Sequence, residues 1–131
     1  PRLGAELASG VDALLDLAQF DNQVSGAIAV ITGEGSIDAQ TAEGKVPAGV
    51  ARRAKHVCKD VPVFAVAAAR EDLGSVYALG IDAVLPIELG PQPLERALSS
   101  AQTRSNLIAS GETLARLIAM REASRTAGHR P

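Results

Sequence analysis

The stretch Ala27-Ile-Ala-Val-Ile-Thr-Gly-Glu-Gly-Ser-Ile-Asp-Ala-Gln-Thr-Ala-Glu-Gly-Lys45 carries the strongest fold signal in this chain. Its first residues, 27–31, are all apolar, which is typical of a central strand buried on both faces of a parallel sheet. Thr32 and Gly33 interrupt the apolar run, so we expect the strand to end there and a glycine-rich loop to follow. Open parallel sheets bind ligands at this end of their strands. The pattern therefore predicts a ligand-binding loop.

The residues of this loop suit a charged ligand. Gly33 and Gly35 allow backbone N–H groups to turn toward an anion without a Cβ in the way. Glu34 and Asp38 offer carboxylates to a divalent cation, and Lys45 can neutralise phosphate oxygens. The alternative interpretation is structural: the two acids cap the next turn or helix, and the lysine is a solvated surface residue.

Two familiar nucleotide-binding motifs do not fit the loop. A dinucleotide fingerprint that starts at Gly33 requires a glycine at position 38, where this chain has Asp38. A P-loop that ends at Lys45 requires a glycine at position 39 and a hydroxyl at position 46, where the chain has Ala39 and Val46. The loop is therefore neither a Rossmann fingerprint nor a Walker motif.

Strand and helix patterns alternate along the rest of the chain. Two further strands are expected over residues 61–68 and 83–87. Helices are expected before the first strand, from Pro47 onward, and over residues 71–79, where Gly80 is a typical left-handed stop. This alternation predicts an α/β fold, a three-layer parallel sheet with helices on both faces, flavodoxin-like or Rossmann-like, joined by right-handed crossovers.

A long helical tract is predicted from Pro93 onward, with Gly111 as the place for a kink or break. Beyond Met120 the chain becomes polar and small, so we expect residues 121–131 to form a frayed tail. The tract carries an apolar stripe that we expect to face the sheet: Leu94, Ala97, Leu98, Ala101, Leu107, Ile108, Leu114, Leu117 and Ile118.

Length and composition exclude several classes of protein. A chain of 131 residues can bury one core, so we expect a single α/β domain over residues 1–131. The net charge of −2 gives no electrostatic basis for binding nucleic acid. No apolar stretch approaches the ~20 residues of a membrane span, and the amino terminus has no signal-peptide pattern. The lone Cys58 cannot form an internal disulfide, so a reducing cytoplasm is the expected location.

The signature loop resembles that of the bacterial ATP-dependent glycerate kinases, in the two-domain type with a flavodoxin-like domain. The matching residues are Ile31-Thr-Gly-Glu-Gly-Ser-Ile-Asp38, Gln40-Thr41, Gly44-Lys45, Pro47 and Gly49-Val-Ala-Arg-Arg-Ala54, and a looser resemblance covers roughly residues 3–119. Two positions depart from the family's pattern. Ser36 stands where the family usually has an arginine, and Ala67-Ala-Ala-Arg70 replaces a glycine and a small polar residue.

The resemblance implies transfer of the γ-phosphate of ATP, with Mg²⁺, to a hydroxyl of glycerate. The family's enzymes are much longer, and this chain resembles only their carboxyl-terminal portion. We therefore expect an incomplete domain of a longer enzyme, inactive when isolated. The implied catalytic residues are Glu34, Asp38 and Lys45, with Mg²⁺ bound through Glu34 or Asp38 and the other acid available as a base. The implied substrate or phosphate contacts are Thr32, Gly33, Gly35, Ser36 and Thr41.

A reading from another class of protein stays open. A non-catalytic domain derived from the same fold would keep the small-anion site and act by binding or by assembly. Missing amino-terminal strands would leave an exposed sheet edge, and such edges pair readily with another chain. On this reading the expected assembly is a homodimer formed through that edge.

Overall fold

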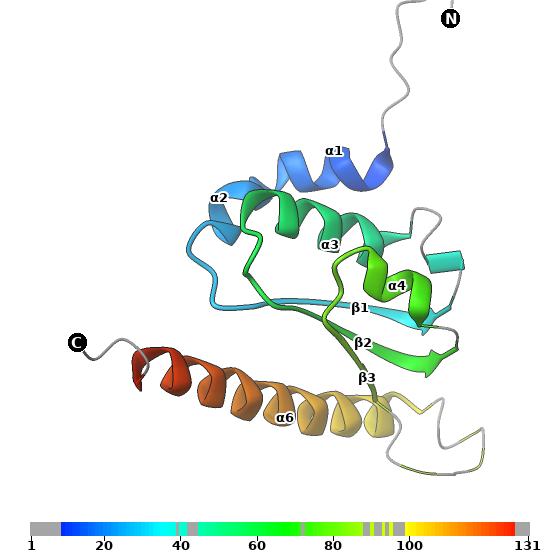
Figure 1. Cartoon of the computed structure of the whole chain (residues 1–131). Coiled ribbons are helices and arrows are strands. Elements are labelled where there is room, and N and C mark those ends of the chain that lie inside the picture. The colour runs from blue at the N-terminus through cyan, green and yellow to red at the C-terminus, as the bar shows by residue number, and fades with distance from the viewer. Residues whose placement is uncertain are drawn as a thin grey trace, which may run out of the picture.

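A sheet of three parallel strands forms the centre of the molecule (Figure 1). The computed structural model describes residues 9–38, 40–41, 45–71, 73–87, 90, 93, 95 and 99–127. In the described part of the chain the strands lie side by side in the order of the sequence, and each pairs with the next in parallel. They are β1 (Val30–Ile37), β2 (Val63–Arg70) and β3 (Ala83–Pro86).

Helices cover both faces of the sheet. Figure 1 shows α3 and α4 on one face, α1 and α2 beside α3, and α6 along the opposite face. This arrangement confirms the predicted α/β fold with a parallel sheet between two helical layers. None of the described helices is long and apolar enough to cross a membrane. The helices are α1 (Gly10–Leu17), α2 (Phe20–Val24), α3 (Val46–Val57), α4 (Gly74–Ala78) and α6 (Ser100–Ala127).

The core lies between the sheet and α3. Alternate residues of β2, which are Val63, Ala65 and Ala67, are buried against Ala51 and Ala54 of α3. This alternation follows from the period of two in a strand, and the small alanines allow the helix to approach the sheet closely. The boundaries of two helices follow their sequence signals: a proline lies in the first turn of α3, and the residue that follows Leu79 is a glycine with φ +98°.

The first strand differs from its prediction in length and in position. It continues to Ile37, and residues 32–34 and 36 pair in register with β2, so the glycine-rich segment is part of β1 and not a loop after it. Within the strand, position 33 requires a glycine because a Cβ there would meet the Val66 side chain at 2.8 Å. Among the described strands β1 lies at an edge, and Ile28 and Ile31 are 55% and 54% exposed. The expectation of a central strand buried on both faces is therefore wrong for the described sheet.

The last helix buries a different face from the one predicted. Its buried residues are Asn106, Ser110 and Leu114, which recur every four positions along one side of α6. Most of the larger residues in the predicted stripe stay exposed, because only Leu114 and the half-buried Ile118 coincide with the row that faces the sheet. The exposed residues are Leu107, Ile108, Leu117 and the neighbouring Met120, whereas Leu94, Ala97 and Leu98 lie outside the described residues.

Helix α6 also continues past the expected break and the expected end. It runs through Gly111 without interruption and ends at Ala127, so residues 121–127 are helical and not a frayed tail. Arg121 donates a hydrogen bond from Nη2 to the backbone oxygen of Asp60 at 2.8 Å, and Arg125 pairs with Glu122. These contacts stabilise the last turns. Residues 128–131 lie outside the described part.

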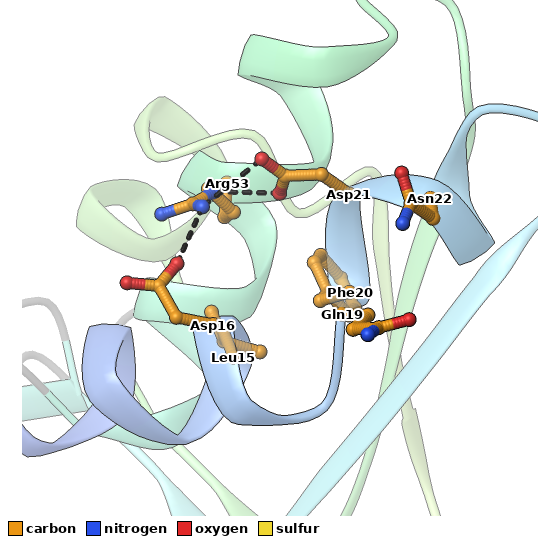
Figure 2. Close-up of a pocket in the computed structure, with 7 residues that line it drawn as sticks. All are labelled: Leu15, Asp16, Gln19, Phe20, Asp21, Asn22 and Arg53. Carbon is orange, nitrogen blue, oxygen red and sulfur yellow. Dashed lines mark hydrogen bonds and ion pairs between the residues drawn. The ribbon is translucent and has the colours of Figure 1, made fainter.

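Arg53 of α3 ties the first two helices to the rest of the fold. Its Nε donates to Asp21 Oδ1 at 2.6 Å, and its Nη2 donates to Asp21 Oδ2 at 3.0 Å and to Asp16 Oδ1 at 2.7 Å. Figure 2 shows the guanidinium between the two carboxylates, at the wall of a cavity of about 260 Å³. The bidentate hydrogen bond is the strong geometry of an arginine and a carboxylate. Arg53 is therefore a cross-link between helices, whereas Arg52 is exposed.

The hydrogen bonds in this cluster shift the pKa values of Asp21 and Arg53. The hydrogen bond from Arg53 lowers the pKa of Asp21 below its ordinary value of 3.8, although burial acts in the opposite direction. The hydrogen bonds to Asp21 and Asp16 raise the pKa of Arg53 further above its ordinary value. Arg53 is therefore protonated in acid, so the pH dependence of the Arg53–Asp21 pair there comes from Asp21.

We expect the Arg53–Asp21 pair to make stability depend on pH in acid. Because folding lowers the pKa of Asp21, its contribution is complete above 3.8 and is lost as the pH falls through the lower folded value. The urea midpoint should fall more steeply below about pH 4 in the unmodified chain than in Arg53→Met. Arg116→Met, which removes an exposed ion pair with Glu112, is the control. Parallel midpoint curves for the unmodified chain and Arg53→Met would contradict this role.

Candidate functional site

The carboxyl end of β1 and the start of α3 bring several predicted site residues together. Strand β1 ends at Ile37, Asp38 follows at once, and residues 40–41 form a short 3-10 turn. Lys45 then occupies the position before the first residue of α3. The chain must reverse here because α3 runs back along the sheet to the start of β2. Asp38 and Lys45 consequently meet at the carboxyl edge of the sheet, as the sequence predicts.

Asp38 and Thr41 hold each other through reciprocal hydrogen bonds. The backbone N–H of Asp38 donates to Thr41 Oγ1 at 3.1 Å. In return, the backbone N–H of Thr41 donates to Asp38 Oδ1 at 3.1 Å and to the Asp38 backbone oxygen at 3.0 Å. Thr41 is fully buried, with no exposed side-chain surface, whereas Asp38 is partly exposed. The structural interpretation of Asp38, that it caps the following turn, is therefore confirmed.

Lys45 also contacts this aspartate. Its Nζ lies 3.5 Å from Asp38 Oδ1, and the two side chains are 32% and 33% exposed. An ion pair this exposed adds little to stability. Its value is chemical, because it places a positive charge beside a carboxylate at the end of the sheet. The first turn of α3 adds the positive end of a helix dipole at the same place.

Glu34 faces the same side of the sheet as α3. It pairs in register with Ala67, a core residue, and residues in register on parallel strands share a face. Its Oε2 is buried and has no hydrogen-bond partner among the described residues. A buried carboxylate oxygen without a partner is costly, so this atom favours a cation, a water or a donor from a ligand.

The other predicted contacts divide between the two faces of β1. Thr32 and Ser36 alternate with the glycines and share the α3 side with Glu34. Gly33 and Gly35 lie on the opposite face, in regular strand conformation. The predicted loop of turned backbone N–H groups is therefore not formed by these glycines. Thr32, Glu34 and Ser36 thus lie on the face of β1 that is on the α3 side of the sheet. Asp38, Thr41 and Lys45 follow after the carboxyl end of that strand.

The carboxylates can be tested for their fit to a metal ion. The described residues contain no group of three or more His, Cys, Asp or Glu side chains close enough to hold a metal. Mg²⁺ rarely needs such a cage, since it usually binds one or two carboxylates, waters and the phosphates of a substrate. Glu34, with its unpaired oxygen, and Asp38 match that smaller donor set, whereas they do not suit a structural zinc site.

Two cavities in the described structure lie elsewhere. One is the cavity beside Arg53, between α1, α2 and α3 (Figure 2). The other, of about 310 Å³, lies by Ser25, Asp60 and the carboxyl end of α6. Neither is lined by the predicted site residues, which border an open edge of the sheet. Sequence reasoning did not find the Arg53 cluster, because its partners are 32 and 37 positions away in the chain.

Comparison with known proteins connects this architecture to one family. A model of the glycerate kinase family matches residues 2–119. The chain is 46% identical over 100 residues to a glycerate kinase of Bacillus subtilis strain 168, covering 76% of this chain and 26% of that protein. It is 43% identical over 117 residues to a glycerate kinase of Haemophilus influenzae strain Rd, covering 88% of this chain and 30% of that protein.

A solved structure agrees with these relatives. The fold superposes on a crystal structure assigned as glycerate kinase 2 from Salmonella typhimurium LT2 with a TM-score of 0.56 and 34% sequence identity. The match covers 94% of this chain and 29% of the solved chain. The chain therefore spans between a quarter and a third of the length of these proteins.

We expect Lys45 to bind phosphate at the end of β1. In an NMR titration with millimolar inorganic phosphate, the amide signals of Asp38, Lys45 and Val46 should shift. Lys45→Ala should weaken the apparent affinity by about tenfold, because a charge-assisted contact contributes roughly 1.5 to 3 kcal/mol at best and less when exposed. The exposed Lys59 gives the control, since Lys59→Ala removes the same charge at the far end of α3. Equal effects of the two substitutions would mean that only net charge matters.

Proposed function

Because the chain belongs to the glycerate kinase family, we propose that it forms the carboxyl-terminal part of an enzyme that transfers the γ-phosphate of ATP to a hydroxyl of glycerate. The observation that carries this proposal is the family match over residues 2–119, which includes the whole of β1 and α3. Relatives named glycerate kinase share up to 46% of the matched residues. The proposed location is the cytoplasm.

The residues at the end of β1 supply what phosphoryl transfer requires. The reaction depends on positioning and on neutralising charge around the transferred group, more than on covalent chemistry by the protein. Lys45 contributes a positive charge at the first turn of α3, where helix N–H groups also favour anions. We propose that Lys45 contacts a phosphate oxygen or the glycerate carboxylate.

Glu34 and Asp38 are proposed for the two remaining roles, binding of Mg²⁺ and acceptance of a proton. When bound, Mg²⁺ neutralises phosphate oxygens, and Glu34 or Asp38 would hold it. We propose that the carboxylate that does not hold the ion accepts the proton of the attacking hydroxyl. The buried Oε2 of Glu34 supports a role for that residue as a ligand of a cation, since it lacks any other partner among the described residues.

The strand supplies the proposed wall of the substrate site. Thr32 and Ser36 present hydroxyls on the same face as Glu34, which suits hydrogen bonds to a small polyhydroxy acid. At Gly33 the Val66 side chain already occupies the opposite face of β1, whereas Gly35 leaves that face without a side chain, so a ligand or another segment of the enzyme can approach the backbone at Gly35. Nothing lies within 4 Å of a Cβ built on Gly35.

One observation favours the alternative, a non-catalytic domain that assembles through its sheet. Ile31 of the edge strand β1 and Ile28, two residues before this strand, are more than half exposed, and such an edge pairs readily with another strand. On this proposal the chain forms a homodimer that hides both isoleucines. Solution mass tests this assembly, because a dimer supports pairing through the edge or a swapped arrangement, whereas a stable monomer supports a self-contained binding module.

We expect the isolated chain to lack kinase activity. Holding donor and acceptor in line contributes roughly 7 to 11 kcal/mol in well-oriented systems, and a chain that spans about 26% of its relative cannot supply all of that geometry. A coupled ADP-release assay with ATP, Mg²⁺ and D-glycerate should show far less than one turnover per second, which is roughly the lower end of ordinary enzymes. Turnover at about that rate, lost in Asp38→Ala, would contradict the partial-enzyme proposal.

A grafted enzyme tests the function directly. The segment of the Bacillus subtilis glycerate kinase that matches this chain would be replaced by this chain's residues, and kcat/KM for D-glycerate would be measured. We expect activity within about tenfold of the host enzyme, since 46% of the matched residues are already identical. Lys45→Ala in the graft should lower kcat/KM by about 10- to 100-fold, as expected for one charge-assisted contact.

The graft has its own controls. Lys59→Ala is the control for Lys45→Ala and should leave kcat/KM unchanged. Glu112→Gln, which should also leave kcat/KM unchanged, is the matched control for a Glu34→Gln variant of the graft. A graft that folds like its host but has no activity, or one that keeps full activity with Lys45→Ala, would overturn the proposed roles.

A further inference from the structure

We propose that Thr41 is a positioning residue that fixes the carboxylate of Asp38 beside Lys45 without touching the substrate. This inference rests on the proposed function, because it matters to catalysis only if Asp38 and Lys45 act on the reaction. It differs from the role implied by sequence, in which Thr41 contacts substrate or phosphate directly.

Among the described residues, the hydrogen bonds of the Thr41 hydroxyl and amide connect it to Asp38. Its hydroxyl accepts the Asp38 backbone N–H at 3.1 Å, and its own N–H reaches both the Asp38 carbonyl and Oδ1. The hydroxyl also lies 3.5 Å from Asp38 Oδ1. One residue thus holds the backbone and the side chain of the aspartate at once.

Burial separates this role from substrate contact. Thr41 has 0% of its surface exposed, so a ligand at the edge of the sheet cannot reach its hydroxyl in this conformation. A buried hydroxyl without a partner would be costly, and the Asp38 amide removes that cost. The same oxygen therefore satisfies the threonine and orients the aspartate.

The hydrogen bonds between Thr41 and Asp38, which we call the clamp, also influence where the ammonium group of Lys45 lies. Asp38 Oδ1, the oxygen that accepts the Thr41 N–H, is the atom 3.5 Å from Lys45 Nζ. A free aspartate would sample several rotamers, and a free lysine many more. Because Thr41 fixes Oδ1, the flexible ammonium group has one preferred partner. Groups that are already held in one geometry react faster, because little conformational entropy remains to be lost in the transition state.

Two substitutions separate positioning from simple core filling. Thr41→Val keeps the volume and shape of the side chain and removes the hydroxyl, whereas Thr41→Ser keeps the hydroxyl and removes a methyl group. If Thr41 only fills space, valine should be tolerated better than serine. If Thr41 positions Asp38, serine should preserve the site and valine should not. The two roles predict opposite rank orders.

The test uses the full 131-residue chain. Hydrogen exchange of the Asp38 amide would be followed by NMR in the unmodified chain, Thr41→Ser and Thr41→Val, with the thermal midpoint as a check on folding. Removing one acceptor should speed exchange of that amide by up to about tenfold in Thr41→Val and little in Thr41→Ser. Thr113→Val is the matched control, since this exposed threonine of α6 donates its hydroxyl hydrogen bond to the Ala109 carbonyl, far from Asp38.

A second measurement links the clamp to the site. Inorganic phosphate is the probe, and its apparent dissociation constant should rise by roughly three- to tenfold in Thr41→Val and stay near the unmodified value in Thr41→Ser and Thr113→Val. Unchanged exchange of the Asp38 amide in Thr41→Val, or better phosphate binding by valine than by serine, would overturn the proposal. Absence of phosphate binding by the unmodified chain would count against the proposed function instead, and the exchange rates would still decide the role of Thr41.

Discussion

The parallel pairing of β1 with β2 is the constraint on which the site depends. It runs in register from Val30↔Val63 to Ile37↔Arg70 and fixes the direction of β1 toward the edge where Asp38 emerges. A parallel connection must return to the start of the next strand, and α3 provides that return. The first turn of α3 therefore lies beside the last residue of β1. The meeting of Asp38 with Lys45 follows from topology, before any attraction between their charges is considered.

Local signals in the sequence predict the elements well and their surroundings poorly. Pro47 and Gly80 mark helix ends because the proline ring and a positive φ act on the backbone of one residue, whatever surrounds it. Gly33 gives a local signal for a strand end, yet hydrogen bonding to β2 carries β1 to Ile37. The buried face of α6, formed by Asn106, Ser110 and Leu114, depends on which side meets the sheet, and helical periodicity alone does not determine that side.

The sequence predicted the location of the candidate site and part of the chemical role of its residues. Asp38 and Lys45 were expected at the carboxyl end of the first strand, and they are there. The competing structural interpretation of Asp38 is equally correct, because its carboxylate accepts the N–H of Thr41. The two interpretations are compatible, since a carboxylate fixed by one donor offers its charge to a second group in a defined direction. No pattern in the sequence distinguishes a threonine that contacts a ligand from one that holds the residue that does.

Ligand binding and the stability of the sheet edge are linked through β1. Strand β1 carries the half-exposed Ile31 and the buried Oε2 of Glu34, which has no partner among the described residues, and the exposed Ile28 lies two residues before the strand. Each feature raises the free energy of the folded state: the first leaves apolar surface in water, and the second leaves a polar atom without a partner. A cation that bound Glu34 in the folded strand and not in the unfolded chain would stabilise β1 by mass action. Covering of the isoleucines by another segment of the enzyme acts on the same strand. On the proposed function, assembly of the longer enzyme and occupation of its site would therefore favour the same conformation of β1, and each would promote the other.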